Sequence, residues 1–244
     1  MKNTFTIAQR ELRAYFDSLV AYVVVGLSMI GLGAYFFLYR GGVWQVDRAS
    51  IGLMFEFLPW ILTIIVIPLV TMRAIAEEKR SGTFELLITL PVTDSEVILG
   101  KYLGALGMTF VLLAMTFLYP VVMFVWPWHL GALDWGPVWS GYLGLSLFCA
   151  AGVAVGLLFS SLTESQVIAF FFTAALLGFL YAIGGLTEGT RSVFGDVIAF
   201  TSFQSRFIPF SRGLIDTRAI VYFLSITVLC LLIAFRSLES RKWS

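Results

Sequence analysis

Long apolar runs alternate with short polar segments along this chain, and the polar segments hold nearly all of the charged residues. The core of a bilayer is ~30 Å thick, so a helix that crosses it needs roughly 20 apolar residues. Six runs fit, at residues 19–38, 53–72, 97–125, 139–160, 166–185 and 219–236. They show no alternation typical of a barrel, and backbone groups in lipid must be satisfied within the segment. We therefore expect an all-α polytopic membrane protein with six transmembrane helices.

Residues 3–17, which precede the first run, have a different pattern. Apolar residues recur there at steps of three and four, at Phe5, Ala8, Leu12, Tyr15 and Leu19. Polar residues lie on the other faces, namely Lys2, Gln9, Arg10 and Arg13. This pattern predicts an amphipathic helix in the inner membrane interface. The alternative interpretation is a plain extension of the first span.

The polar segment between the second and third runs predicts a structured loop. Ser81 and Gly82 should end the helix that leaves the second run, and Pro91 should stop a short helix that follows. Three apolar residues share one face of that short helix: Phe84, Leu87 and Ile88. Thr93 and Glu96 have the spacing of a capping box at the start of the third run. A solvated charged linker is the alternative.

The distribution of lysine and arginine predicts the orientation. With the N-terminus inside, ten of these residues fall in the inner segments and six in the outer ones. Both termini are then cytoplasmic. The outer segment from Leu186 to Thr217 mixes apolar and polar residues too finely to span the membrane. We expect it to lie on the outer face or to re-enter the membrane.

Composition agrees with a membrane protein. The hydrophobic fraction is 59%, and the mean hydropathy is +0.91. Charged residues make up 13%, whereas a typical soluble domain is nearer ~25% charged. A net charge of +1 provides no basic surface for nucleic acid. Cys149 and Cys230 both lie in apolar runs, so we interpret them as packing residues.

The sequence lacks the residues that catalysis or cofactor binding would need. The Gly-Lys pair Gly100-Lys101 fails the phosphate-binding pattern because Ser95 stands at the first glycine position and Tyr102 follows the lysine. The single histidine, His129, cannot form a zinc site with three or four ligands. We therefore expect no catalytic, cofactor-binding or metal-binding residue in this chain.

Within the spans, charge is scarce and small residues recur. Glu56 lies close to the outer end of the second run and Lys101 close to the inner end of the third. A proton-coupled carrier would need deeper ionisable groups. Two pairs of glycines have the spacing that lets membrane helices approach closely. They are Gly100 with Gly104, and Gly152 with Gly156.

The inner loop resembles that of type-2 ABC transporter permeases. The matching residues are Ala76-Glu77-Glu78-Lys79-Arg80-Ser81-Gly82-Thr83-Phe84-Glu85-Leu86-Leu87, followed by Leu90-Pro91-Val92. The C-terminal part resembles the gliding-motility permease branch and the nitrous-oxide-reductase maturation permease. Its matching residues are 210–218, 222–225 and 238–243. The likeness covers essentially the whole chain.

The resemblance implies a single transmembrane permease domain over residues 1–244. It implies that two permease chains, identical or different, pair in the plasma (inner) membrane and bind two cytoplasmic ATPase subunits, which hold ATP and Mg²⁺. The short helix after Gly82 would be the coupling helix that contacts the ATPase. The implied coupling residues are Glu77, Glu78, Arg80, Ser81, Gly82, Thr83, Phe84, Glu85, Leu87, Ile88 and Pro91. A second contact would involve Ser161, Thr163 and Glu164.

Together, the pattern and the resemblance predict the permease subunit of an ATP-driven ABC transporter, an exporter or a machine that works on the outer face. An auxiliary subunit on the outer face is a further candidate partner. The alternative is a membrane scaffold that transmits force and moves no solute. ATP hydrolysis is expected in the partner subunit in either case.

Overall fold

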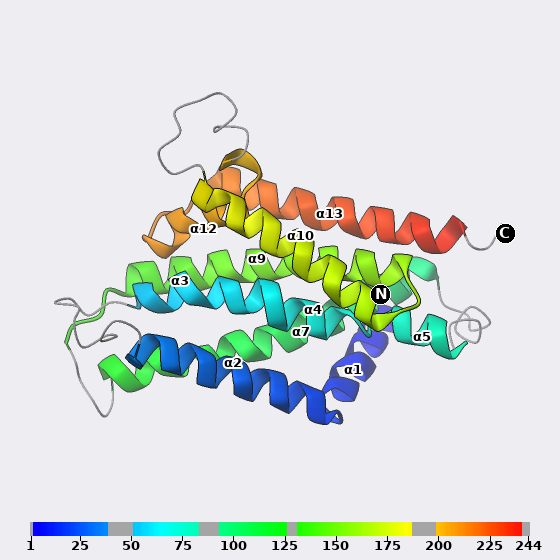
Figure 1. Ribbon diagram of the computed structural model, residues 1–244, viewed down its shortest axis with the longest axis horizontal. Coiled ribbons are helices and arrows are strands. Elements are labelled where there is room, and N and C mark those ends of the chain that lie inside the picture. The colour runs from blue at the N-terminus through cyan, green and yellow to red at the C-terminus, as the bar shows by residue number, and fades with distance from the viewer. Residues whose placement is uncertain (1, 39–50, 83–92, 126–130, 187–198, 241–244) are drawn as a thin grey trace.

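The computed structural model describes residues 2–38, 51–82, 93–125, 131–186 and 199–240. These residues form helices and turns, with no strand among them, and six helical segments are long and apolar enough to cross a membrane. The prediction of an all-α protein with six candidate spans is confirmed. The segments run side by side as an elongated bundle (Figure 1).

Three of the spans lie in the first half of the chain; the first is a single helix, and the second and third each join three helical pieces. The first is α2 (Leu19–Leu38); the second joins α3 (Gly52–Ile61), the π-helix η2 (Leu62–Val66) and α4 (Ile67–Thr71); the third joins α7 (Asp94–Thr116), α8 (Leu118–Pro120) and the π-helix η3 (Val121–Val125). The other three are single helices: α9 (Trp135–Leu162), α10 (Gln166–Leu186) and α13 (Thr217–Ser240).

The second span contains two prolines, and it widens into η2 between them. Pro59 and Pro68 lack the N–H that would continue the helical hydrogen-bond ladder. The Thr63 hydroxyl donates to the Pro59 and Trp60 carbonyls, each at 3.0 Å, where the π-helix begins. The span stays helical up to Thr71, where the chain turns toward α5 (Ala76–Ser81).

Helix α9 forms the centre of the bundle, and three of its glycines, Gly141, Gly152 and Gly156, face the second span. A Cβ at Gly141 would lie 2.3 Å from the ring of Phe55, and one at Gly152 would lie 2.6 Å from Ile67. Helix α13 packs along the other side of α9 (Figure 1). Small residues at these positions let α9 approach the second span closely.

Two short helices lie at one end of the bundle. Helix α1 (Lys2–Phe16) crosses the end of α7, and α5 leaves the second span beside it (Figure 1). We call this end, where the last turns of α9 and α13 also lie, the charged end. The chain turns at Asp17 and Ser18 before α2 begins, so α1 is a separate helix and not an extension of the first span.

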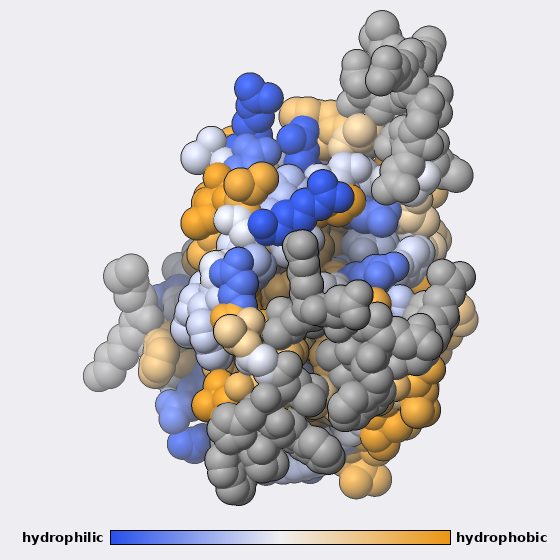
Figure 2. Space-filling view, turned by 90° about the vertical axis from the view of Figure 1, so that its left-hand side faces the viewer, coloured by the Kyte–Doolittle hydropathy of each residue, from blue (hydrophilic) through white to orange (hydrophobic). Residues whose placement is uncertain are grey.

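At the opposite end, α12 (Phe203–Ser211) packs against α9 and α10. Its Phe203, Phe207 and Phe210 side chains are buried, and the Ser140 hydroxyl donates to the Phe210 carbonyl at 2.7 Å. The described part of the segment 186–217 thus packs into the bundle. Figure 2 looks onto this end and shows hydrophilic residues across it, with hydrophobic residues along the flanks.

Candidate functional site

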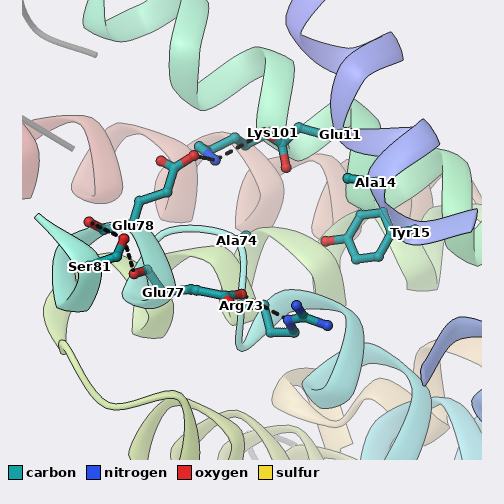
Figure 3. Close-up of a pocket in the computed structure, with 9 residues that line it drawn as sticks. All are labelled: Glu11, Ala14, Tyr15, Arg73, Ala74, Glu77, Glu78, Ser81 and Lys101. Carbon is teal, nitrogen blue, oxygen red and sulfur yellow. Dashed lines mark hydrogen bonds and ion pairs between the residues drawn. The ribbon is translucent and has the colours of Figure 1, made fainter. Parts of the chain in front are cut away.

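Helix α5 is held at the charged end by three consecutive charged side chains. The Glu77 carboxylate accepts a hydrogen bond from Arg73 at 2.9 Å, and the Glu78 carboxylate lies 2.7 Å from the Lys101 ammonium group (Figure 3). The Lys79 ammonium group donates to the backbone carbonyl of Ser161 at the end of α9. Successive residues on a helix point about 100° apart, so these contacts fix α5 on several sides.

Ser160 of α9 caps the start of α5. The first N–H groups of a helix have no partner within it, and Ile75, the N-cap residue of α5, provides no side-chain cap. The Ser160 hydroxyl oxygen accepts the backbone N–H groups of Ile75 at 3.0 Å and Ala76 at 3.1 Å. It also donates to the Met72 carbonyl at 3.3 Å. Ser160 is fully buried, so one hydroxyl group joins the turn after the second span to α9.

The other end of α5 is closed by a glycine. Gly82 has a left-handed backbone with φ of 71°, and its N–H donates to the Lys79 carbonyl at 3.3 Å. A residue without a Cβ adopts this conformation at little cost. The helix break predicted at Ser81 and Gly82 is therefore present.

Lys101 lies at the centre of a charged cluster between α1, α5 and α7. Its side chain is 1% exposed, and its ammonium group lies 3.2 Å from Glu11 and 2.7 Å from Glu78. The Arg10 guanidinium group lies 2.9 Å from Glu11 and 3.7 Å from Glu78. We call these four residues the Lys101 cluster. Two cations and two carboxylates offset one another, as a buried ammonium group requires.

Helix α1 reaches this position because α7 has glycines where the two helices cross. A Cβ at Gly100 would lie 2.6 Å from Ile7, and a Cβ at Gly104 would lie 2.6 Å from the Cβ of Glu11. The Tyr15 hydroxyl donates to the Val70 carbonyl at 2.8 Å and joins α1 to the second span. Burial, followed by the Glu11 charge, raises the pKa of the Tyr15 phenol.

A cavity of about 190 Å³ opens between α1, α5 and α7. It is lined by Glu11, Ala14, Tyr15, Arg73, Ala74, Glu77, Glu78, Ser81 and Lys101 (Figure 3). Most of its charged groups already form ion pairs with one another. The cavity therefore resembles a contact between helices more than a ligand pocket. The described residues contain no group of three or more metal-binding side chains.

Five of the eleven expected coupling residues lie in the part of the chain that the structure describes. Glu77, Glu78, Arg80, Ser81 and Gly82 lie on or directly after α5, with Arg80 and Ser81 exposed. The expected residues outside the described part are Thr83, Phe84, Glu85, Leu87, Ile88 and Pro91. The capping box at the start of α7 is present, because Thr93 and Glu96 each bond the other's backbone N–H.

Of the residues expected at a second contact, Ser161 contacts α5, and Thr163 and Glu164 lie at and just after the end of α9. The backbone carbonyl of Ser161 accepts Lys79, and Glu164 is exposed just beyond the end of α9. The Thr163 hydroxyl accepts the N–H of Ser165 at 3.1 Å. Ser160 carries no signal in the sequence, and the sequence pattern places Lys101 only at the end of a span. A lysine inside an apolar run was nevertheless a signal, because burial would demand carboxylate partners.

The glycines expected at helix contacts all face another helix. Gly100 and Gly104 face α1, whereas Gly152 and Gly156 face the second span. At Gly156 the approach is closest, because an added Cβ would lie 2.1 Å from the Thr71 hydroxyl oxygen.

A bundle with six candidate spans and an anchored helix at one end defines a polytopic membrane protein. A family model described as "ABC-2 family transporter protein" matches residues 34–236, so the chain belongs to that family. It is a type-2 ABC permease, a membrane transport component that is not itself catalytic and whose ATPase activity lies in a partner. A search of curated proteins found no match.

Proposed function

We propose that this chain is the permease subunit of an exporter in the plasma (inner) membrane and couples ATP hydrolysis by a separate ATPase to work across the membrane. Two such chains, or this chain and a different permease, pair and bind two ATPase subunits. The excess of lysine and arginine on the predicted inner segments supports a cytoplasmic location for both termini and the charged end. The C-terminal residues support a place near the gliding-motility and nitrous-oxide-reductase maturation branches.

The anchoring of α5 is the observation that carries this proposal. Coupling requires an element that contacts the ATPase and changes its contacts between two states. Helix α5 follows directly from the second span, and Ser160 and Lys79 join it to α9. Displacement of the segment after Gly82 would therefore act on the second span and α9 together.

The segment 83–91 supplies the expected ATPase contact. Its apolar residues Phe84, Leu87 and Ile88 suit a groove on the ATPase, and the exposed Arg80 adds a charge beside them. Glu164 is exposed at the same end and suits the second contact.

The test is co-purification of the tagged chain from its own cells in mild detergent, with the bound ATPase identified by mass spectrometry. We expect the unaltered chain to bring down an ABC ATPase and Phe84→Glu to lose it. Phe200→Glu is the matched control, because Phe200 is 60% exposed and lies at the opposite end. Absence of any ATPase from the unaltered chain, or its retention by Phe84→Glu, would contradict the proposal.

The second candidate is a scaffold that transmits force to a partner on the outer face and moves no solute. The burial of α12 favours it, because Phe203, Phe207 and Phe210 join the outer segment to the bundle. Reconstitution of the complex in vesicles separates the two functions. Flux that depends on ATP supports the exporter, whereas ATP turnover without flux of any candidate solute supports the scaffold.

A further inference from the structure

The Lys101 cluster has a geometry that interface binding by α1 does not explain. An amphipathic helix lies in the interface through its apolar face and needs no bond to a neighbouring helix. Here Glu11 of α1 and Glu78 of α5 bind the same ammonium group, at 3.2 and 2.7 Å (Figure 3). Lys101 therefore joins α1 to the helix that we propose receives the force from the ATPase.

Stability alone is a poor reason for such a cluster. Removing charges from water is costly, and well-packed apolar residues can often replace a buried ion pair without loss of stability. What an ion cluster adds is a specific relative position, since each carboxylate must stay within bonding distance of the same cation. The Arg10 guanidinium group, between the two carboxylates at 2.9 and 3.7 Å, strengthens the same restraint.

The contacts around the cluster extend this restraint to the whole of α1. The glycines of α7 let α1 approach to van der Waals contact, with Gly100 facing Ile7 and Gly104 facing Glu11. Near its end, α1 is bound to the second span through Tyr15 and Val70. A movement of α5 would thus reach α1 through Lys101, and α1 continues into α2 after two residues.

We propose that Lys101 is a positioning residue that makes α1 part of the moving unit, so that α1 follows α5 when the ATPase closes on ATP. This inference rests on the proposed function, because it needs an ATPase that acts on α5. It gives the first span, which α1 precedes, a route by which ATP binding can move it.

The experiment measures the position of α1 in the complex of the permease with its ATPase in lipid nanodiscs. Nitroxide labels replace Gln9, on the exposed side of α1, and Leu214, which is 64% exposed at the opposite end. Both native cysteines, Cys149 and Cys230, are buried. Distances between the labels are compared without nucleotide and after trapping with ATP and vanadate. We expect the unaltered complex to show a shift on trapping.

Two variants each break one side of the connection while leaving Lys101 a carboxylate partner. Glu11→Gln, made together with Arg10→Gln because Arg10 also lies 3.7 Å from Glu78, removes the bonds from α1, and Glu78→Gln removes the bonds from α5. We expect either variant to reduce the shift of α1 strongly, with the bond between Tyr15 and Val70 still in place, and the two variants combined to reduce it no further. Glu239→Gln is the control, because it removes an exposed ion pair with Arg236 on α13 and should keep the shift.

Each outcome decides a separate point. Loss of the ATPase from the unaltered chain contradicts the proposed function. With the ATPase bound and hydrolysing ATP, an α1 that stays still on trapping overturns this inference alone. A full shift in both variants also overturns it, because α1 would then move without the Lys101 cluster. If Glu78→Gln weakens ATPase binding, the variant with Arg10→Gln and Glu11→Gln, whose changes lie outside α5, still gives the decisive result.

Discussion

The hydroxyl oxygen of Ser160 lies 3.0 Å from the backbone nitrogen of Ile75. Ser160 belongs to α9 and caps the start of α5, a helix far from it in the chain. Because the site is buried, Ser160→Ala would leave the N–H groups of Ile75 and Ala76 without a partner. An unsatisfied buried donor costs about 1–3 kcal/mol. We expect a lower unfolding temperature in detergent and faster proteolysis at α5.

Ser161→Ala is the matched control for that change. Ser161 is equally buried, but its hydroxyl bonds only the Leu158 carbonyl one turn earlier in α9. Its contact with Lys79 uses the backbone carbonyl, which the substitution keeps. Equal destabilisation by the two substitutions would show that the interhelical cap is unimportant.

The contact between α9 and the second span predicts a strong effect at Gly156. A Cβ there would lie 2.1 Å from the hydroxyl oxygen and 2.7 Å from the Cβ of Thr71, so the helices would have to separate. Overpacking of this kind typically costs about 1–3 kcal/mol. Gly178→Ala is the control, because nothing lies within 4 Å of its added Cβ. Thermal unfolding of the two variants should differ accordingly, and a Gly156→Ala variant as stable as Gly178→Ala would refute the close packing.

The length and polarity of the runs were sufficient to predict the six candidate spans, because crossing a bilayer is a local requirement that each segment meets alone. The capping box of Thr93 and Glu96 was predictable for the same reason. The cap that Ser160 provides was not, because it depends on the turn of another span. Lys101 could be recognised as an unusual residue. Its partners could not, because Glu11 and Glu78 lie 90 and 23 residues before it in the chain.

The crossing of α1 and α7 gives a third prediction. Gly104→Leu would place a bulky side chain where the Cβ of Glu11 now lies, 2.6 Å from an added Cβ. We expect α1 to move away from α7, and the first span to remain inserted. Proteolysis within α1 should be faster in the Gly104→Leu variant than in the unaltered chain, because α1 then loses its close contact with α7. It should stay unchanged in Gly107→Ala, whose added Cβ would lie 3.3 Å from a Leu12 methyl group.

Tyr15 predicts how the attachment of α1 depends on pH. Its hydroxyl donates to the Val70 carbonyl at 2.8 Å, so Tyr15→Phe should cost about 1 kcal/mol at neutral pH. Burial and the charge of Glu11 raise the pKa of the phenol above its ordinary value of about 10. Because the pKa of Tyr15 is higher in the folded state, the stabilisation that its hydrogen bond provides is fully present at any pH below the pKa of tyrosine in the unfolded chain.

The stabilisation from the Tyr15 hydrogen bond then decreases as the pH rises from the pKa of the phenol in the unfolded state toward its pKa in the folded state. The unfolding temperature of the unaltered protein should therefore exceed that of Tyr15→Phe by a constant amount up to about pH 10, and the difference should narrow above it. The measurement is thermal unfolding of both proteins in the same detergent between about pH 7 and 11. A difference that widens at high pH would contradict the burial of the neutral phenol against the second span, because the ionised form would then be the one that the folded state stabilises.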